Sequence, residues 1–221
     1  MISRLSLILL IGSVTVLPSF SQNKKFDKSL RKADSYYYAG SYTKANSALQ
    51  SLKKSIVLKM GQQNSYMPGL YIREARINLA TGVLENFDKA LNSALTSSLA
   101  TFGENSESYA GTMIDVAEVY NEYGHYRLSR EHLTKAKELL KRINHLTGYS
   151  EGRIALLESE AMTGQGFCNE AIEQLKGMES YFAGRAVEKE TIVDGASIKT
   201  QRVPDEEIPK RYSDYGKLLT L

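Results

Sequence analysis

The stretch FGENSESYAGTMIDVAEVYNEYGHY, from Phe102 to Tyr126, decides the fold. Its apolar residues recur at steps of three and four, a spacing that places them on one face of a helix. Gly124 follows at the point where a left-handed residue can end that helix. The stretch therefore predicts a helix that stops before Gly124 and a second helix that starts at Tyr126.

The pattern around Gly124 recurs along the chain. A glycine, an apolar residue two positions on and a small residue three further stand at 40–45, 124–129 and 166–171. A fourth copy starts at Phe87, without glycine at that offset and with Gly82 further upstream. Taken as anchors, four residues are separated by 45, 39 and 42 positions, a mean period of 42: Tyr42, Phe87, Tyr126 and Cys168.

Each anchor opens a helix with its apolar residues on one side. The first, third and fourth copies share the same offsets, whereas the stripe that begins at Phe87 drifts. Cys168, at the fourth anchor, is expected to be a small buried hydrophobe. On the helix before each of the first three anchors a small residue lets the two helices approach closely: Ala33, Ala75 and Ala117.

The predicted units are antiparallel helix pairs. One pair cannot bury both of its apolar faces, but stacked neighbours can, so an array of such pairs is stable. No β-alternation and no run rich in Val, Ile and Thr stands out, so no sheet is expected. We predict an all-α array of four pairs at 26–39 with 42–59, 65–81 with 84–102, 106–123 with 126–146, and 150–164 with 167–183.

The stretch from Phe102 to Tyr126 resembles the tetratricopeptide repeats (TPR), most closely the 42-residue subclass of kinesin light chains and many bacterial proteins. The signature positions are filled by Ala110, Met113, Val116, Ala117, Tyr120, Gly124 and Tyr126. The resemblance covers residues 26–183, with departures at Lys32, Ser129 and Cys168. It implies a right-handed superhelix whose first helices line a concave groove.

Carried over position by position, the resemblance gives candidate groove residues in the first and third repeats. They mix apolar, acidic and amide groups, which suits an extended peptide or a helix better than a small metabolite. An ordinary solvated helix face is an equally good interpretation at this stage. The candidates are Asp27, Leu30, Asp34, Tyr37, Gly111, Ile114, Glu118 and Asn121.

No catalytic, cofactor or metal site is predicted. The three histidines, His125, His132 and His145, lack metal-ligand spacing, and Cys168 has no cysteine partner. Gly164 and Gly166 follow a helix and are interpreted as a turn, not as a phosphate-binding loop. The sequence therefore does not predict an enzyme.

The charge balance argues against nucleic acid as a partner. From residue 22 onward 27 Lys and Arg face 25 Asp and Glu, and phosphate binding needs a concentrated basic face. The one basic cluster considered, between Lys135 and Arg142, is interleaved with Glu131 and Glu138, as on a solvated helix face.

The first residues have the layout of a secretory signal peptide. A basic start is followed by an apolar run, Leu5 to Leu17, and then by small residues at Ser19 and Ser21. The run is shorter than the roughly 20 residues of a membrane-spanning helix, although an uncleaved anchor is the alternative. We expect cleavage after Ser21, no stable membrane insertion afterwards, and export to a bacterial periplasm or to the medium.

Beyond the array the period fails. Residues 184–205 are expected to form an irregular linker, and 206–221 a helix that caps the array or starts a truncated fifth repeat. The leading functional hypothesis is an exported scaffold that binds a protein or peptide of unknown identity. The alternative is the extracytoplasmic sensory or regulatory part of a longer signalling or protease protein.

Overall fold

The structure is a computed structural model that describes residues 20–177, 186–193 and 197–204. The predicted signal region up to residue 19 and the predicted C-terminal helix at 206–221 lie outside these residues. Eight helices make up the described array: α1 (Phe20–Tyr38), α2 (Tyr42–Met60), α3 (Met67–Ala80), α4 (Leu84–Phe102), α5 (Glu107–Glu122), α6 (Tyr126–Arg142), α7 (Gly148–Gly164) and α8 (Cys168–Gly177).

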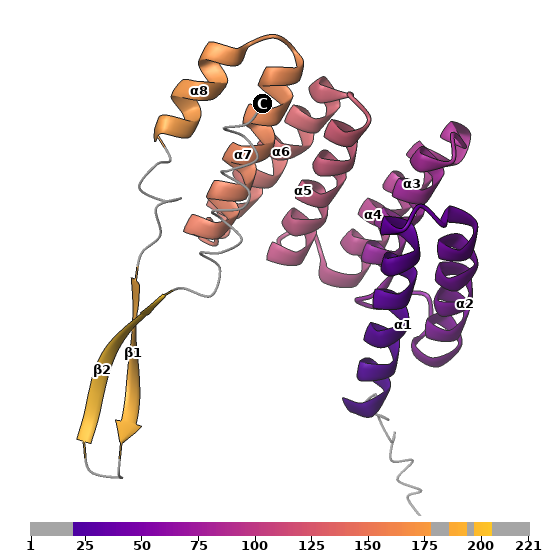
Figure 1. Ribbon diagram of the computed structural model, residues 1–221, viewed down its shortest axis with the longest axis horizontal. Helices are drawn as coiled ribbons and strands as arrows, with labels where there is room; N and C mark the ends of the chain where they lie inside the picture. The colour runs from indigo at the N-terminus through magenta and orange to yellow at the C-terminus, as the bar shows by residue number, and fades with distance from the viewer. Residues whose placement is uncertain (1–19, 178–185, 194–196, 205–221) are drawn as a thin grey trace, which may run out of the picture.

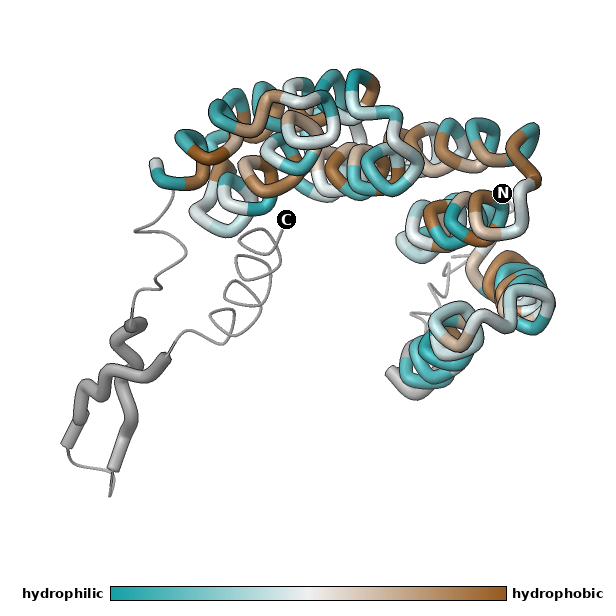
Figure 2. The backbone as a smooth tube through the Cα atoms, turned by 45° about the horizontal axis from the view of Figure 1, so that its top comes forward, coloured by the Kyte–Doolittle hydropathy of each residue, from teal (hydrophilic) through white to brown (hydrophobic). Residues whose placement is uncertain are grey.

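The helices form consecutive pairs that follow one another across the molecule, from α1 and α2 at one end to α7 and α8 at the other (Figure 1). Hydrophobic and hydrophilic residues alternate along each helix (Figure 2). The predicted all-α array is thereby confirmed. Its small contact residues Ala33, Ala75 and Ala117 are all buried, as predicted.

The core consists of three clusters, each shared between one pair and the next. The first joins residues of α1 and α2, such as Leu49, to Met67 and Leu70 of α3. The second joins α3 and α4 to α5 through Phe87 and Val116. The third joins α5 and α6 to α7. Each pair therefore buries its second apolar face on its neighbour, as a repeat array must.

The repeat is more regular than the anchors suggested. The second helices begin at 42, 84, 126 and 168, and Gly40, Gly82, Gly124 and Gly166 precede them with φ between 69° and 87°. The anchor at Phe87 was therefore wrong: the equivalent residue is Leu84, and Phe87 takes the place of Ala45. With this register the drift disappears, because Phe87, Leu91, Ala94 and Ser98 are all buried in α4.

Cys168 also departs from its prediction, because it is exposed. The equivalent Tyr126 packs against the first helix of the following repeat, at Gly164. Within the described residues no helix pair follows α8, so Cys168 has no such neighbour to cover it.

Two strands follow the array, which corrects the expectation of an irregular linker without a sheet. Strands β1 (Ala186–Val193) and β2 (Ser197–Pro204) pair antiparallel, with Ala186 opposite Pro204 and Val193 opposite Ser197. The sequence signals were the β-branched residues of both segments and the Asp194-Gly195 dipeptide between them, a common hairpin connection.

Candidate functional site

The first helices of the pairs are tied together by a row of ionic contacts, which we call the charged ladder. Its contacts join residues about one repeat apart, so each spans two neighbouring pairs. The ladder consists of Asp34 on α1, Arg73 and Arg76 on α3, Asp115, Glu118 and Glu122 on α5, and Arg153 on α7.

The first step of the ladder is a two-pronged pair. Arg73 donates from Nε to Asp34 Oδ1 at 2.7 Å and from Nη2 to Asp34 Oδ2 at 3.0 Å. Its remaining Nη1 donates to the carbonyl oxygen of Gly69. A planar guanidinium that meets both carboxylate oxygens fixes orientation as well as distance. The pair therefore adds one oriented contact between α1 and α3.

Glu118 is the centre of the ladder. Its Oε2 accepts from Arg153 Nη2 at 2.6 Å, and its Oε1 lies 3.5 Å from Arg76 Nη2. Arg76 also contacts Glu122 at 2.8 Å, and Arg153 contacts Asp115 at 2.7 Å. One carboxylate thus links the second, third and fourth pairs.

The two central arginines are held in their charged form. Burial acts to lower the pKa of Arg76, but the hydrogen bond and charge of Glu122 and the charge of Glu118 outweigh it, and the pKa is raised. The pKa of Arg153 is raised for the same reason by Asp115 and Glu118, against burial. Both guanidiniums are therefore permanent charges of the ladder.

The carboxylates of the ladder face solvent more than the arginines do. The side chains of Asp115, Glu118 and Glu122 are 42%, 38% and 37% accessible, whereas those of Arg76 and Arg153 are 24% and 27% accessible. The middle of this face therefore presents acceptor oxygens, with the positive charges set behind them.

A small cavity lies where the ladder starts. Its volume is ≈ 60 Å³, and Asp34, Tyr37, Tyr38, Arg73 and Arg76 line it above a floor of apolar residues. Burial, followed by the charge of Glu122, raises the pKa of Tyr37. Such a volume is far below the 300–1,000 Å³ of metabolite pockets, so this cavity is too small to enclose a small-molecule substrate.

The structure gathers several predicted groove residues on this face and explains what they contact. Asp34 and Glu118 belong to the ladder, and Tyr37 lines the cavity. Asn121 donates from Nδ2 to the carbonyl oxygen of Leu157 at 2.8 Å. Asp27 accepts from the hydroxyl of Tyr66 at 3.3 Å.

Two apolar candidates belong to the core instead. Ile114, predicted to be exposed in the groove, is 3% accessible and lies in the third core cluster, so that prediction is wrong. Leu30 is partly buried against the first cluster. Leu30 and Ile114 are equivalent positions, and the corresponding residue of the second repeat is Ile72. At these positions the side chain packs toward the neighbouring helix, as Ile72 does. Gly111 is partly exposed, with open space where a side chain would project.

Arg73, Arg76 and Arg153 were missed from the sequence. The repeat period pointed to two of these arginines. Arg76 stands one period of 42 residues after the candidate Asp34, and Arg153 stands three periods after the candidate Asp27. The candidate groove residues came from the first and third repeats, whereas these arginines belong to the second and fourth. A further signal in the sequence is the charge of the first pair, because residues 20–60 carry nine Lys and Arg against two acids.

The histidines and Cys168 are not brought together. His125 and His132 stack on Tyr120, and His145 Nδ1 lies 3.4 Å from Glu107. Among the described residues no group of three or more His, Cys, Asp and Glu is placed to hold a metal ion. A search of the same residues finds no helix with the length and apolarity needed to cross a membrane.

Comparison with known proteins gives one kind of match. No family model matches the sequence, and no curated protein matches it. A solved structure, described as a putative kinesin light chain with nearly identical TPR-like repeats from Podospora anserina, is similar at a TM-score of 0.56 and 15% identity. The match covers 89% of this chain and 92% of that one. The chain therefore has the fold of a tetratricopeptide-like helical repeat array.

Proposed function

We propose that the chain is an exported interaction scaffold that holds a segment of a partner protein against the face of α1, α3, α5 and α7. A TPR-like array offers a long, rigid surface, and this architecture serves protein recognition in general. The supporting observation is the charged ladder. It fixes side chains from four helices in one row, so the row is already ordered before a partner arrives.

The exposure of the ladder defines the chemistry of the partner. Because the carboxylates of Asp115, Glu118 and Glu122 are the more accessible groups, the face attracts Lys and Arg side chains and backbone N–H donors. The exposed ring of Tyr38, 83% accessible, stands beside the cavity and offers an apolar contact to the same segment. We therefore infer that the partner segment is basic and extended or helical, and that the face is a concave groove.

The test is a selection from a random peptide display library on the immobilised full chain, followed by affinity measurement of the selected peptides. We expect enrichment of Lys and Arg. The variant Asp115→Asn/Glu122→Gln should bind them about tenfold more weakly, because each lost charge weakens the attraction. The matched variant Glu131→Gln/Glu138→Gln, on exposed positions of α6, removes the same charge and should bind within about twofold. Equal binding by all three chains would refute a role for this face.

Export is a separate part of the proposal and rests on the N-terminal sequence. Cleavage after Ser21 leaves a chain that begins at Gln22 and retains the buried Phe26 of α1. Expression in a Gram-negative bacterium followed by intact-mass measurement of the periplasmic fraction tests it. A mass that starts at Gln22 supports export, whereas a full-length chain in the cytoplasm contradicts it.

A further inference from the structure

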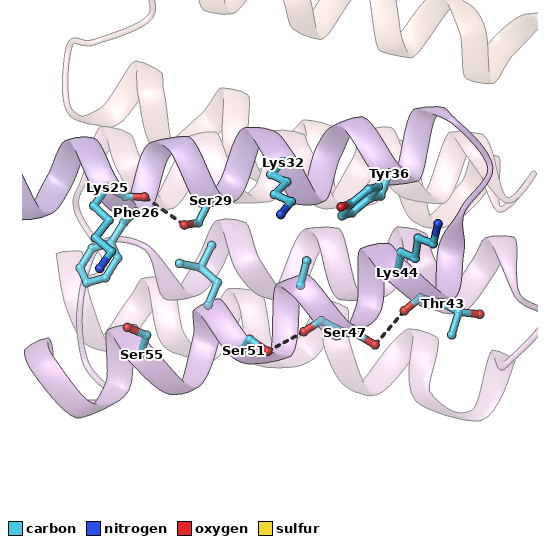
Figure 3. Close-up of a pocket in the computed structure, with 12 residues that line it drawn as sticks. Lys25, Phe26, Ser29, Lys32, Tyr36, Thr43, Lys44, Ser47, Ser51 and Ser55 are labelled. Atoms are coloured by element: carbon cyan, nitrogen blue, oxygen red, sulfur yellow. Dashed lines mark hydrogen bonds between the residues drawn. The ribbon is translucent and has the colours of Figure 1, made fainter.

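A second surface of the first helix pair shares no residue with the charged ladder. A groove of ≈ 540 Å³ runs between α1 and α2, the first helix pair of the array (Figure 3). Lys25, Lys32 and Lys44 stand along it, with the hydroxyls of four serines between them. None of the described residues that line it is acidic. We call it the basic groove.

The positive charge of the basic groove is part of a net positive charge of the whole first helix pair. Residues 20–60 carry a net charge of +7, whereas residues 61–221, with 18 basic and 23 acidic residues, carry −5. The two acids of the first pair both turn to the next pair: Asp34 is bound by Arg73 and Asp27 by Tyr66. The lysines of the groove therefore keep their positive charge uncompensated by these carboxylates.

In the second helix pair, the α3 residues equivalent to the groove lysines contact α2. In that pair Met67 and Leu70 of α3 are buried against α2, and Glu74 accepts from Lys53 of α2 at 2.8 Å. Glu74 also accepts from Gln50 at 3.1 Å. In the second pair α2 thus covers one edge of this surface, at Met67, Leu70 and Glu74 of α3. The rest of it, lined by Tyr71, Lys89 and Ser93, is an open groove there as well.

One repeat earlier, the same three positions are lysines. Forty-two residues before Met67, Leu70 and Glu74 stand Lys25, Lys28 and Lys32, all exposed. At these positions the chemistry therefore changes from apolar and acidic to basic. If the charges of this face of α1 served solubility alone, basic and acidic residues would be mixed, as they are on α6. A single sign along one groove favours an occupant of the opposite sign.

The hydroxyls of the groove favour a peptide over a phosphate-rich polymer. Ser29, Ser47 and Ser51 each donate to a main-chain carbonyl one turn earlier, as the dashed lines of Figure 3 mark. Their oxygens therefore remain as acceptors. A phosphate brings acceptors alone, whereas a peptide brings carboxylates for the lysines together with hydroxyl and amide donors for the serines.

We propose that the basic groove is the docking site of an acidic amphipathic helix from a partner protein, which stacks on α1 as α2 stacks on α3. Lys25 and Lys32 are seven residues apart, about 10.5 Å along the helix axis. The docked helix therefore carries Glu or Asp at positions about two turns apart on the face that meets α1. This surface is distinct from the charged ladder and takes a partner of opposite charge.

The test uses the full chain and a labelled helical peptide of about 20 residues, long enough to be helical on its own, with Glu two turns apart on one face. Fluorescence anisotropy measures its affinity, and hydrogen exchange locates it. We expect binding that protects α1 and α2, and a loss of about tenfold or more in Lys25→Glu/Lys32→Glu. The control Lys135→Glu/Lys141→Glu, on exposed positions of α6, has the same net charge and should retain affinity within about twofold.

Four outcomes would overturn the proposal. The first is an equal loss of peptide affinity in both double variants, which would mean attraction by net charge alone. The second is tighter binding of single-stranded DNA or of phosphatidylglycerol vesicles than of the peptide. The third is protection from hydrogen exchange outside α1 and α2, and the fourth is no binding of the peptide. Self-association that Lys25→Glu/Lys32→Glu abolishes would replace the partner with a second copy of this chain. The library selection on the ladder face is independent of all of these.

Discussion

The ring of Tyr126, the first residue of α6, occupies the space into which a side chain at Gly164 of α7 would project. A Cβ atom added to Gly164 would lie 2.1 Å from Cζ of Tyr126. Real Cβ atoms do not approach a ring so closely, so either the ring or α7 would have to move. The contact joins the third pair to the fourth, at the end of α7 where the chain turns into α8.

Gly164→Ala should therefore destabilise the array. Displacing a packed ring or a helix typically costs about 1–3 kcal/mol, which exceeds the gain from removing a helical glycine. Gly111→Ala is the matched control, because Gly111 also lies in a helix but a Cβ there meets no atom within 4 Å. The control should be more stable by about 0.5–1 kcal/mol. Urea denaturation followed by circular dichroism compares them, and a stabilised Gly164→Ala would contradict the contact.

This contact marks what could and could not be predicted from the sequence. The helix pairs and their small contact residues follow from periodicities that are local and repeated. Gly164 was interpreted as part of a turn, but the turn needs Gly166, whose φ is +87°. Gly164 is required because the ring of Tyr126, 38 residues earlier, leaves no room for a side chain there. The spacing of residues within one helix does not reveal such a contact between helices. The charged ladder differs from this contact, because the 42-residue period does connect the candidate Asp34 to Arg76 and Asp27 to Arg153. What the period does not give is which side chains pair, since the partners lie 35–46 residues apart.

Ser129→Ala should stabilise the protein. Ser129 is fully buried in α6, and its hydroxyl has no hydrogen-bond partner in the structure. The equivalent positions in the first and fourth pairs are Ala45 and Ala171. Removing a buried unpaired hydroxyl recovers about 1 kcal/mol of desolvation.

Ser98→Ala is the matched comparison for Ser129→Ala, with the opposite expected sign. Ser98 is equally buried, but its hydroxyl lies 2.8 Å from Thr112 Oγ1. Its loss should cost about 1 kcal/mol, because one hydrogen bond disappears from a buried site. Thermal melts of the two variants measure the difference, and a destabilised Ser129→Ala would show that Ser129 has a partner after all.

Alkaline pH should destabilise the array through Tyr120. Burial, followed by the charge of Asp88, raises the pKa of Tyr120 from its usual 10 to about 12. The folded state therefore holds the phenol proton more tightly than the unfolded state does. The stabilisation is complete below pH 10 and is lost as the pH rises through 12, by a total of about 2–3 kcal/mol.

The check is a series of denaturation curves between pH 9 and 12 on the wild type and on Tyr120→Phe. The variant lacks the titrating hydroxyl, and its hydrogen bond to Asp88 is long at 3.4 Å, so the fold should survive. Its stability should fall less steeply with pH. The slope will not vanish, because the pKa values of Tyr37 and Tyr66 are raised as well. Parallel slopes in the two proteins would exclude Tyr120 as the cause.

The contact between Glu118 and Arg153 should be worth more than an ordinary surface ion pair. Both side chains are partly shielded, and Glu118 also faces Arg76, so neither charge is fully screened by water. A double-mutant cycle with Glu118→Gln and Arg153→Met should give a coupling energy of about 1 kcal/mol, after allowance for the solvent that still reaches both groups. The same cycle on Arg127 and Glu131, an exposed pair within α6, should give about 0.3–0.5 kcal/mol. High salt should reduce the second coupling more than the first, because exposed charges are the better screened. If both couplings are equally small, the ladder does not order the face, and a partner would have to supply the order that the proposed function takes as already present.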